Sequence, residues 1–320
     1  MIGNGTIERN KASIGVWMIT YNQELHVEQA ILSVLEQQCD QPILLIIGDD
    51  CSTDKTSVIC KKLAAEFPTK IRYERREPNL GMFQNALQTL KDCVEEDYRF
   101  IAFLEGDDYW TDKHKLQKQI DAMRQSPSTS LIFTDAMKLV QGELREFHDA
   151  VRPQAIFGLK QFITSHYRVP TATVMIRRNV ALEIISVLSD VKFKLFHVDY
   201  LMWCVAGSFG TMLFLPSKTA VYRVHGASAV RTLAKEESIQ RGMELNSFLL
   251  EYLGDEYRNH FKGNQWWYYL ELAFLRINDK KTCSAFYWLM MALARSIQYG
   301  RGNQIQIMKD FVYRFRHPSM

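Results

Sequence analysis

The sequence lacks paired cysteines, an excess of charge of one sign, and any long hydrophobic run. Its six cysteines are scattered and form no C-x-x-C pair, which argues against a disulfide framework or a zinc site and is typical of a reducing compartment. Net charge is only +3, from 39 basic and 36 acidic residues, which is too balanced to indicate binding to nucleic acid. The longest apolar run, Ala285–Ala294, is too short to span a bilayer.

The N-terminal stretch MIGNGTIERNKAS has no apolar segment of the signal-peptide kind. Together with the cysteine usage, this predicts a cytoplasmic protein. The 320 residues are 47% hydrophobic and 23% charged, a composition typical of a globular protein with a large core. One domain with an appendage is the organisation that this length favours.

Short apolar runs alternate with helical patterns over most of the chain. The runs predict strands at residues 14–20, 43–47, 71–74, 100–104, 131–133, 173–176, 211–215 and 220–224. Helices are expected between the early strands, for example where Val27, Ile31 and Leu35 recur at helical spacing. This alternation predicts an α/β fold with a mostly parallel sheet flanked by helices. Between 136 and 173 the pattern weakens, and we expect loops and short helices there.

Acidic residues follow two of the predicted strands. The strand at 100–104 runs directly into Glu105-Gly106-Asp107-Asp108, and the strand at 43–47 runs into Gly48-Asp49-Asp50. Open α/β sheets hold their ligands at the carboxyl ends of their strands. Clustered carboxylates repel one another, and Mg²⁺ or Mn²⁺ together with phosphate oxygens would remove that repulsion. The alternative for each cluster is a solvated acidic turn that caps the next helix.

The motifs, taken in order, resemble the family 2 glycosyltransferases of GT-A fold. The resemblance covers about residues 13–230 and rests on Thr20-Tyr21-Asn22, Asp49–Asp54, Asn79-Leu80-Gly81, Leu104–Asp108, Thr173–Arg178, Asp199 and Tyr222–His225. It implies a GT-A type, Rossmann-like sheet in a nucleotide-sugar-dependent domain at 13–230. Residues 231–320, which show only helical patterning, would then form a C-terminal all-helical extension.

The same resemblance implies an activity. A family 2 enzyme of this kind moves a sugar from a nucleotide-diphosphate-sugar donor, most often a UDP-sugar, to an acceptor hydroxyl with inversion. A divalent metal, Mn²⁺ or Mg²⁺, assists. The acceptor would be a glycan or a lipid-linked molecule in cell-surface polysaccharide or glycoconjugate synthesis.

Donor-binding residues carry over from the resemblance position by position. Thr20, Tyr21 and Asn22 would line the base pocket, with Tyr21 stacked on the base. Asp50 would accept a hydrogen bond from a ring N–H of the base. The donor site would also include the Asn79 and Gly81 positions.

The acidic cluster and two later positions carry over in the same way. Asp107 matches the last acid of the family's D-x-D motif and would contact the metal, together with His225. Glu105 stands where the family usually has Asp. Asp199 matches the catalytic base, a carboxylate that takes the acceptor proton as attack proceeds. The alternative for Asp199 is a helix cap, and for His225 a histidine that only packs at the end of a strand.

Two other functions compete with the transferase. A receiver-like phosphoacceptor domain also has acidic residues after the strands of a doubly wound sheet, but it would leave Asp199 and His225 without a role. A catalytically silent nucleotide-sugar-binding protein would fit Glu105 and Val198, two departures from the family pattern. The aromatic, basic C-terminal helices suit either contact with a membrane surface or a packed core with a solvated edge.

Overall fold

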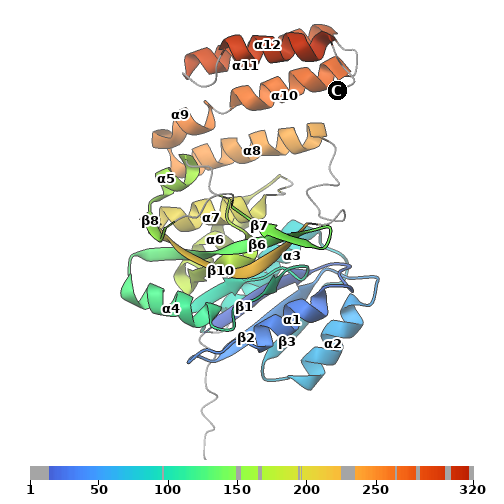
Figure 1. The fold of residues 1–320 in the computed structure, drawn as a ribbon, viewed down its shortest axis with the longest axis vertical. Coiled ribbons are helices and arrows are strands. Elements are labelled where there is room, and N and C mark those ends of the chain that lie inside the picture. The colour runs from blue at the N-terminus through green and yellow to red at the C-terminus, as the bar shows by residue number, and fades with distance from the viewer. Residues whose placement is uncertain are drawn as a thin grey trace, which may run out of the picture. The chain divides into compact units, whose positions relative to one another are not determined.

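The computed structural model describes residues 14–95, 97–148, 153–164, 168–193, 195, 197–224, 235–263, 265–278, 282–299 and 304–316. The chain divides into two compact units (Figure 1). One unit is Met1–Lys192 with His197–Gly226, and the other is Phe193–Phe196 with Ala227–Met320.

The first unit is built on the strands that the sequence predicts most clearly. Strand β1 (Ile14–Thr20) lies in the middle and pairs in parallel with β2 (Ile43–Asp49) on one side and β4 (Phe100–Phe103) on the other. The shorter β3 (Ile71–Arg75) pairs in parallel with β2. Because β1, β2 and β4 are covered on both faces, their sequences are continuous apolar runs rather than alternating ones.

The sheet continues beyond β4 with a change of direction. Strand β9 (Val174–Arg177) is antiparallel to β4, and β6 (Thr129–Val140) is antiparallel to β9. The long β10 (Thr211–Val224) is parallel to β6, and its residues Ala220 and Val221 pair in antiparallel fashion with the short β5 (Tyr109–Trp110). The order is β3-β2-β1-β4-β9-β6-β10-β5. This mixed, mostly parallel α/β sheet flanked by helices confirms the predicted fold class.

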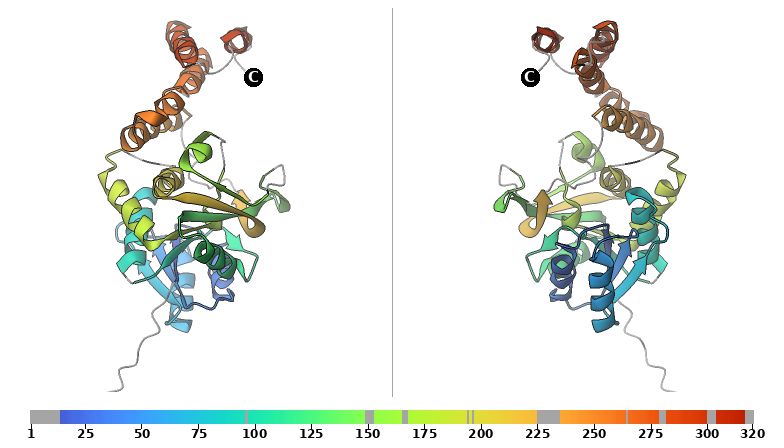
Figure 2. Two further views of the ribbon diagram at one scale, coloured as in Figure 1. Left: turned by 90° about the vertical axis from the view of Figure 1, so that its left-hand side faces the viewer. Right: turned by 90° about the vertical axis from the view of Figure 1, so that its right-hand side faces the viewer.

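Helices cover both faces of this sheet, as Figure 2 shows. Side chains alternate along β1, so Val16 and Met18 join the core cluster formed with α1 (Val27–Leu35), α2 (Thr56–Glu66) and α4 (Lys115–Gln125). Trp17 points to the other face, where its indole N–H donates to the Ala86 carbonyl at 3.0 Å. That face carries α3 (Met82–Glu95), α6 (Arg178–Asp190) and α7 (Val198–Ser208).

Two local predictions were wrong. Strand β6 continues to Val140 and turns back as β7 (Glu143–Glu146), and a further strand, β8 (Ala155–Phe157), pairs with β10. This stretch, which also holds α5 (Leu159–Thr164) and η1 (Thr171–Thr173), was expected to have no strands. All four residues of β7 are exposed, so the hairpin leaves no apolar pattern to read.

The second error concerns the last strand of the sheet. The two strands expected at 211–215 and 220–224 are one strand, β10, with register shifts between Leu215 and Ala220. Pro216, which lies within it, has no N–H to donate and imitates the end of a strand in the sequence. The irregular pairing accommodates the proline without ending the strand.

The second unit is all-helical, as expected. It comprises α8 (Lys235–Leu253), η3 (Asp255–Tyr257), α9 (Arg258–Phe261), α10 (Gln265–Asn278), α11 (Thr282–Gln298) and α12 (Gln304–Arg316). Its own core cluster includes Tyr269, Phe274, Leu289 and Phe311, and Tyr269 stacks on Trp288 with ring centroids 5.6 Å apart. In the part of the chain that the structure describes, no helix combines the length and apolar character needed to cross a membrane.

Candidate functional site

The carboxyl ends of β1, β2 and β4 meet at one edge of the sheet. Thr20 and Asp49, the last residues of β1 and β2, are register partners. The loop after β4 lies against the end of β1, where the Gly106 N–H donates to the Ile19 carbonyl at 3.0 Å. A Cβ at Gly106 would stand 2.5 Å from Gln23 Oε1, so this close approach requires glycine. The loop that carries the acidic cluster is thereby held beside the loops after β1 and β2.

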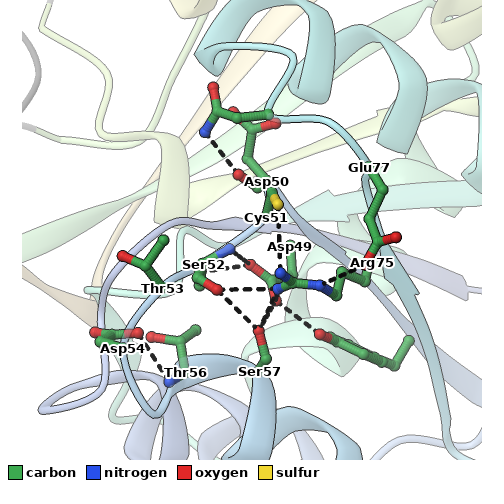
Figure 3. Close-up of polar contacts among 12 residues, drawn as sticks. Asp49, Asp50, Cys51, Ser52, Thr53, Asp54, Thr56, Ser57, Arg75 and Glu77 are labelled. Carbon is green, nitrogen blue, oxygen red and sulfur yellow. Dashed lines mark hydrogen bonds and ion pairs between the residues drawn. The ribbon is translucent and has the colours of Figure 1, made fainter.

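Asp49 is a structural residue at this edge (Figure 3). Its buried carboxylate accepts hydrogen bonds from the Ser52 and Ser57 hydroxyls and from Tyr73 OH at 2.7 Å. Burial on its own would raise the pKa of Asp49, but these hydrogen bonds outweigh it and lower the pKa below its ordinary value. The Arg75 guanidinium lies 3.5 Å from the same carboxylate. With its oxygens occupied in this way, Asp49 fixes the shape of the loop at 50–57.

Asp50 is oriented by the Asn79-Leu80-Gly81 turn. Its Oδ1 accepts the Leu80 N–H at 2.7 Å, and its backbone carbonyl accepts the Asn79 side-chain amide at 2.6 Å. Gly81 has a φ of +81°, a left-handed conformation that favours glycine. Within the described residues, no group donates to Asp50 Oδ2. The structure therefore brings Asn79 and Gly81 to Asp50 as supports of its loop. Asp50 is buried, and one of its carboxylate oxygens has no donor among the described residues.

The loop after β1 supplies the remaining residues expected to bind a donor. Thr20 is buried, and its hydroxyl donates to Gln23 Oε1 at 2.7 Å. Asn22, with a φ of +51°, accepts the Thr53 N–H at 2.8 Å and so ties this loop to the one after β2. The Tyr21 side chain is 47% exposed. Its ring is accessible for stacking with a planar ligand.

Burial and mutual repulsion disfavour ionisation of the carboxyl groups in the acidic cluster. Burial, followed by the charges of Asp107 and Asp199, raises the pKa of Glu105 to about 8, against a hydrogen bond from Thr171. Burial and the charges of Asp107 and Glu105 likewise raise the pKa of Asp108 well above its ordinary value. Asp108 is buried, and within the described part of the chain its Oδ2 has no hydrogen-bond partner. Such a cluster favours a bound proton or a cation.

Asp199 lies in the first turn of α7 and faces this cluster closely enough to perturb Glu105. Burial raises the pKa of Asp199, opposed by backbone N–H groups of the helix end, at Tyr200 and Asp199, and by the charge of His197. The helix has no side-chain cap. A carboxylate in this position accepts backbone hydrogen bonds and can also accept a proton from a ligand. The structure thus brings together Asp199 and the cluster, which lie far apart in sequence.

Arg223 was given no role from the sequence, although it belongs to the Tyr222–His225 motif. Its backbone N–H donates to Asp108 Oδ1 at 2.8 Å, and its guanidinium donates to the Asp107 carbonyl and to Gln29 Oε1. The guanidinium also lies 4.4 Å from the centroid of the Tyr109 ring. Tyr222, next to it, has a pKa raised to about 12 by burial and by the acidic residues of the cluster. Arg223 therefore positions the acidic loop.

The donor set fits a divalent cation that is only partly held by protein. The described residues include no group of three His, Cys, Asp or Glu side chains arranged to hold a metal by themselves. Mg²⁺ and Mn²⁺ sites that also use substrate phosphates need only one or two carboxylates. Asp108 Oδ2, which has no hydrogen-bond partner among the described residues, and the repulsion between the neighbouring carboxylates suit such a site. His225, the other predicted ligand, lies outside the described residues.

A family model, Glycosyl transferase family 2, matches residues 16–181, which is more than half of the chain. Curated Mycobacterium tuberculosis relatives are 27% identical over 208 residues, and the match spans 65% of this chain and 57% of their length. The dTDP-rhamnosyl transferase RfbG of Shigella flexneri is 34% identical over 110 residues, 33% of this chain and 36% of that protein. The minor teichoic acid biosynthesis protein GgaB of Bacillus subtilis is 36% identical over 94 residues, 29% of this chain and 10% of that protein.

A solved structure with the same fold is that of S. aureus TarS 1-349 in complex with UDP-GlcNAc. The TM-score is 0.67 at 16% sequence identity, and the match covers 95% of this chain and 92% of TarS 1-349. The likeness therefore extends over both compact units of the chain. At this identity it shows a shared fold.

Proposed function

Because the chain belongs to glycosyl transferase family 2, we propose that it transfers a sugar from a nucleotide-diphosphate-sugar to an acceptor hydroxyl, with inversion at the anomeric carbon. The observation that carries this proposal is the meeting of three features at one sheet edge. These are the loops of Tyr21 and Asp50, the Glu105–Asp108 cluster, and Asp199. The two loops would bind the nucleobase, the acidic cluster would lie at the diphosphate, and Asp199 would face the acceptor hydroxyl.

The nucleotide end of the donor would lie against the first two loops. Tyr21 is exposed enough to stack on a base, and Asp50 Oδ2 is available to accept a ring N–H. Uracil and thymine both carry such an N–H. The complex of TarS with UDP-GlcNAc and the name of RfbG, a dTDP-rhamnosyl transferase, support a pyrimidine donor, and we favour a UDP-sugar.

The diphosphate would lie over the acidic cluster. Asp107 and His225 would hold a divalent cation there, and a bound Mn²⁺ or Mg²⁺ would neutralise the charge that develops on the leaving diphosphate. Arg223 keeps the cluster in place through the Asp107 carbonyl and the Asp108 carboxylate. Glu105 and Asp199 would then face the sugar side of the site.

Asp199 would act as the general base. Direct displacement with inversion needs a carboxylate on the face opposite the leaving group, where it accepts the proton of the attacking hydroxyl. The burial that raises the pKa of Asp199 makes this carboxylate a stronger proton acceptor than an exposed aspartate. The acceptor would be a glycan or lipid-linked molecule of a cell-surface polysaccharide, a class supported by the similarity to GgaB, a minor teichoic acid biosynthesis protein.

The test is donor hydrolysis in the absence of acceptor. A panel of UDP-, dTDP- and GDP-sugars is incubated with the protein and Mn²⁺, and the released nucleoside diphosphate is measured. We expect slow hydrolysis of one pyrimidine donor, its loss in excess chelator and its return with Mn²⁺ or Mg²⁺. Asp107→Asn should lower the rate by about 100-fold or more, because a bound metal supplies several kcal/mol to the leaving group.

Two outcomes would contradict the proposal. Full activity in excess chelator would remove the metal from the reaction. Tight binding of a nucleoside diphosphate without turnover, with every donor and acceptor tried, would favour a silent sugar-nucleotide-binding protein instead.

A further inference from the structure

A positively charged cavity lies at the amino-terminal end of β4, opposite the end that carries the acidic cluster. It has a volume of about 350 Å³ and is lined by Gln41, Arg99, Phe100, Arg124, Arg177, Arg178 and Asn179. Phe100 begins β4, and Arg177, its register partner, ends the antiparallel β9. Glu105 follows the other end of β4, which at about 3.3 Å per residue puts the cavity some 15 Å away from the acidic cluster. It is therefore separate from the proposed donor site.

The charge of this cavity is only partly balanced. Arg124 pairs with Asp40 at 3.1 Å and with Asp121 at 3.4 Å. Across the described ranges, no carboxylate pairs with Arg99 or Arg177. Arg177 donates its Nε and Nη2 to the carbonyls of Thr129, Met123 and Ser126. These carbonyls hold the guanidinium in place at the end of α4, 5.8 Å from the centroid of the Phe100 ring. Among the described residues, no group accepts a hydrogen bond from its Nη1.

The start of α6 adds further hydrogen-bond donors. This helix, Arg178–Asp190, begins at the cavity wall and has no side-chain cap. The Arg178 N–H donates to the Arg99 carbonyl at 3.0 Å, which ties the exposed Arg99 to the helix start. A helix N-terminus carries partial positive charge and free N–H groups. The guanidinium of Arg178 itself donates to the Val94 carbonyl at 2.8 Å. Among the described residues, the cavity thus combines the guanidinium groups of Arg99, Arg124 and Arg177 with a helix start whose N-cap residue makes no side-chain cap.

We propose that this cavity binds a phosphate group. Guanidinium groups match the planar, two-oxygen recognition of phosphate, and charge-assisted hydrogen bonds to it are strong. A water molecule occupies about 30 Å³. The cavity, at about 350 Å³, is therefore large enough for a phosphate ion, which is only a few times the size of a water molecule. It admits a phosphate that carries organic substituents. Free phosphates and the phosphodiester links of a polymer share this chemistry, and binding of either does not depend on the proposed transferase activity.

The experiment measures binding by titration calorimetry at low salt, with chelator present to suppress any metal-dependent binding at the acidic cluster. The probes are inorganic phosphate and poly(glycerol phosphate). Arg99→Glu reverses a charge on an exposed side chain, and Arg124→Gln removes one. Arg145→Glu is the matched control, because Arg145 is an exposed arginine of β7 whose side chain is 55% accessible. Circular dichroism verifies that each variant is folded.

We expect Arg99→Glu to weaken binding of the probe by about tenfold or more, since a charge-assisted contact is replaced by repulsion, and Arg124→Gln to weaken it less. Arg145→Glu should stay within twofold of the parent protein in the same assay. Tighter binding of the polymer per phosphate would identify a phosphodiester ligand, and equal binding would identify a free phosphate. No measurable binding of either probe, or equal affinity in Arg99→Glu and Arg145→Glu, would overturn the proposal.

Discussion

Asp199 supplies the carboxylate to which we assign the acceptor proton. Asp199→Asn keeps the size of the side chain but removes the basic group, so we expect transfer to fall by about 10²- to 10⁴-fold, the usual contribution of a positioned general base. Nucleoside diphosphate affinity should change by less than about threefold, or under 1 kcal/mol, because the donor loops come from other strands. Initial-rate assays and titration calorimetry on the same preparation would measure both quantities.

Asp50→Asn is the matched variant. It alters the carboxylate that we expect to accept the hydrogen bond from the nucleobase N–H. It should therefore weaken nucleotide binding more than it slows the chemical step. If Asp199→Asn folds, binds nucleotide and transfers at the normal rate, Asp199 is only part of the helix start. Glu105 would then be the next candidate base. Asp135 is a poorer one, because its hydrogen bond with His148 at 2.8 Å, acting against burial, lowers its pKa.

Lys115 is a buried lysine, and the effect of its charge on the free energy of unfolding can be measured. Its ammonium donates to Gln119 at 2.8 Å and lies 4.3 Å from the Trp110 ring centroid. Burial lowers the pKa of Lys115 from 10.5 to about 7, with Asp112 opposing the shift. Between these two pH values the unfolded chain binds more protons than the folded one, so the free energy of unfolding rises with pH across this window.

Lys115→Met should remove that dependence. We expect the free energy of unfolding in urea to rise less steeply between pH 7.5 and 9.5 in the variant, by up to about 1.4 kcal/mol per pH unit. The same protein should be no less stable than the parent at pH 7. Identical pH slopes for the two proteins would show that Lys115 stays charged in the folded state.

At the level of secondary structure, the sequence predicts what is buried and misses what is exposed. Strands β1, β2 and β4 are continuous apolar runs, so their positions and their parallel pairing could be inferred. The exposed β7 hairpin and the continuity of β10 across Pro216 could not, because pairing there depends on partners far away in the chain. For the same reason, the sequence shows that Asp107 and Asp199 are acidic but not that Arg223 holds the Glu105–Asp108 loop in place through the Asp107 carbonyl.

Packing of α3 against β2 depends on a glycine. A Cβ at Gly48 would stand 1.9 Å from Thr89 Oγ1 and 2.8 Å from Asn85 Oδ1, and Asn85 also donates its side-chain amide to the Gly48 carbonyl at 2.9 Å. Gly48→Ala should therefore push α3 away and lower the free energy of unfolding by about 1–3 kcal/mol or more. Gly158→Ala, where a Cβ meets nothing within 4 Å, should cost less than about 1 kcal/mol. Urea unfolding of both variants measures the difference, and equal losses would contradict the steric argument.

For the whole molecule, the division into two units gives each its own core. The sequence predicts helices from residue 232 onward but not which aromatic side chains are inside. Tyr269, Phe274 and Phe311 are buried in the helical core, whereas Trp267 and Tyr287 are more than half exposed. The packed-core interpretation thus holds for part of the aromatic set. A packed core does not explain the exposed aromatic side chains, such as Trp267 and Tyr287.

Further exposed apolar side chains lie on α11 and α12. Phe286, Tyr287, Met290 and Ile297 of α11 are 49–68% exposed, and Met308, Val312 and Tyr313 of α12 are 40–55% exposed. Arg295 and Lys309 lie on the same two helices. Apolar and basic side chains on one helix are the combination that binds an anionic membrane surface. A lipid-linked acceptor would place such a surface beside the enzyme.

We therefore expect the protein to sediment with vesicles that contain anionic lipid and to be released by salt, which screens the attraction to basic residues. The double variant Met290→Glu/Ile297→Glu replaces two exposed apolar side chains of α11 with negatively charged ones. It should lower the bound fraction by about tenfold, because it removes apolar area that the membrane would bury and adds repulsion from the anionic lipids. Val58→Glu/Leu144→Glu, which changes two side chains 67% and 56% exposed in the other unit, is the control and should bind as the parent does. If the parent protein sediments equally with and without vesicles, the exposed apolar side chains of α11 and α12 do not bind a membrane.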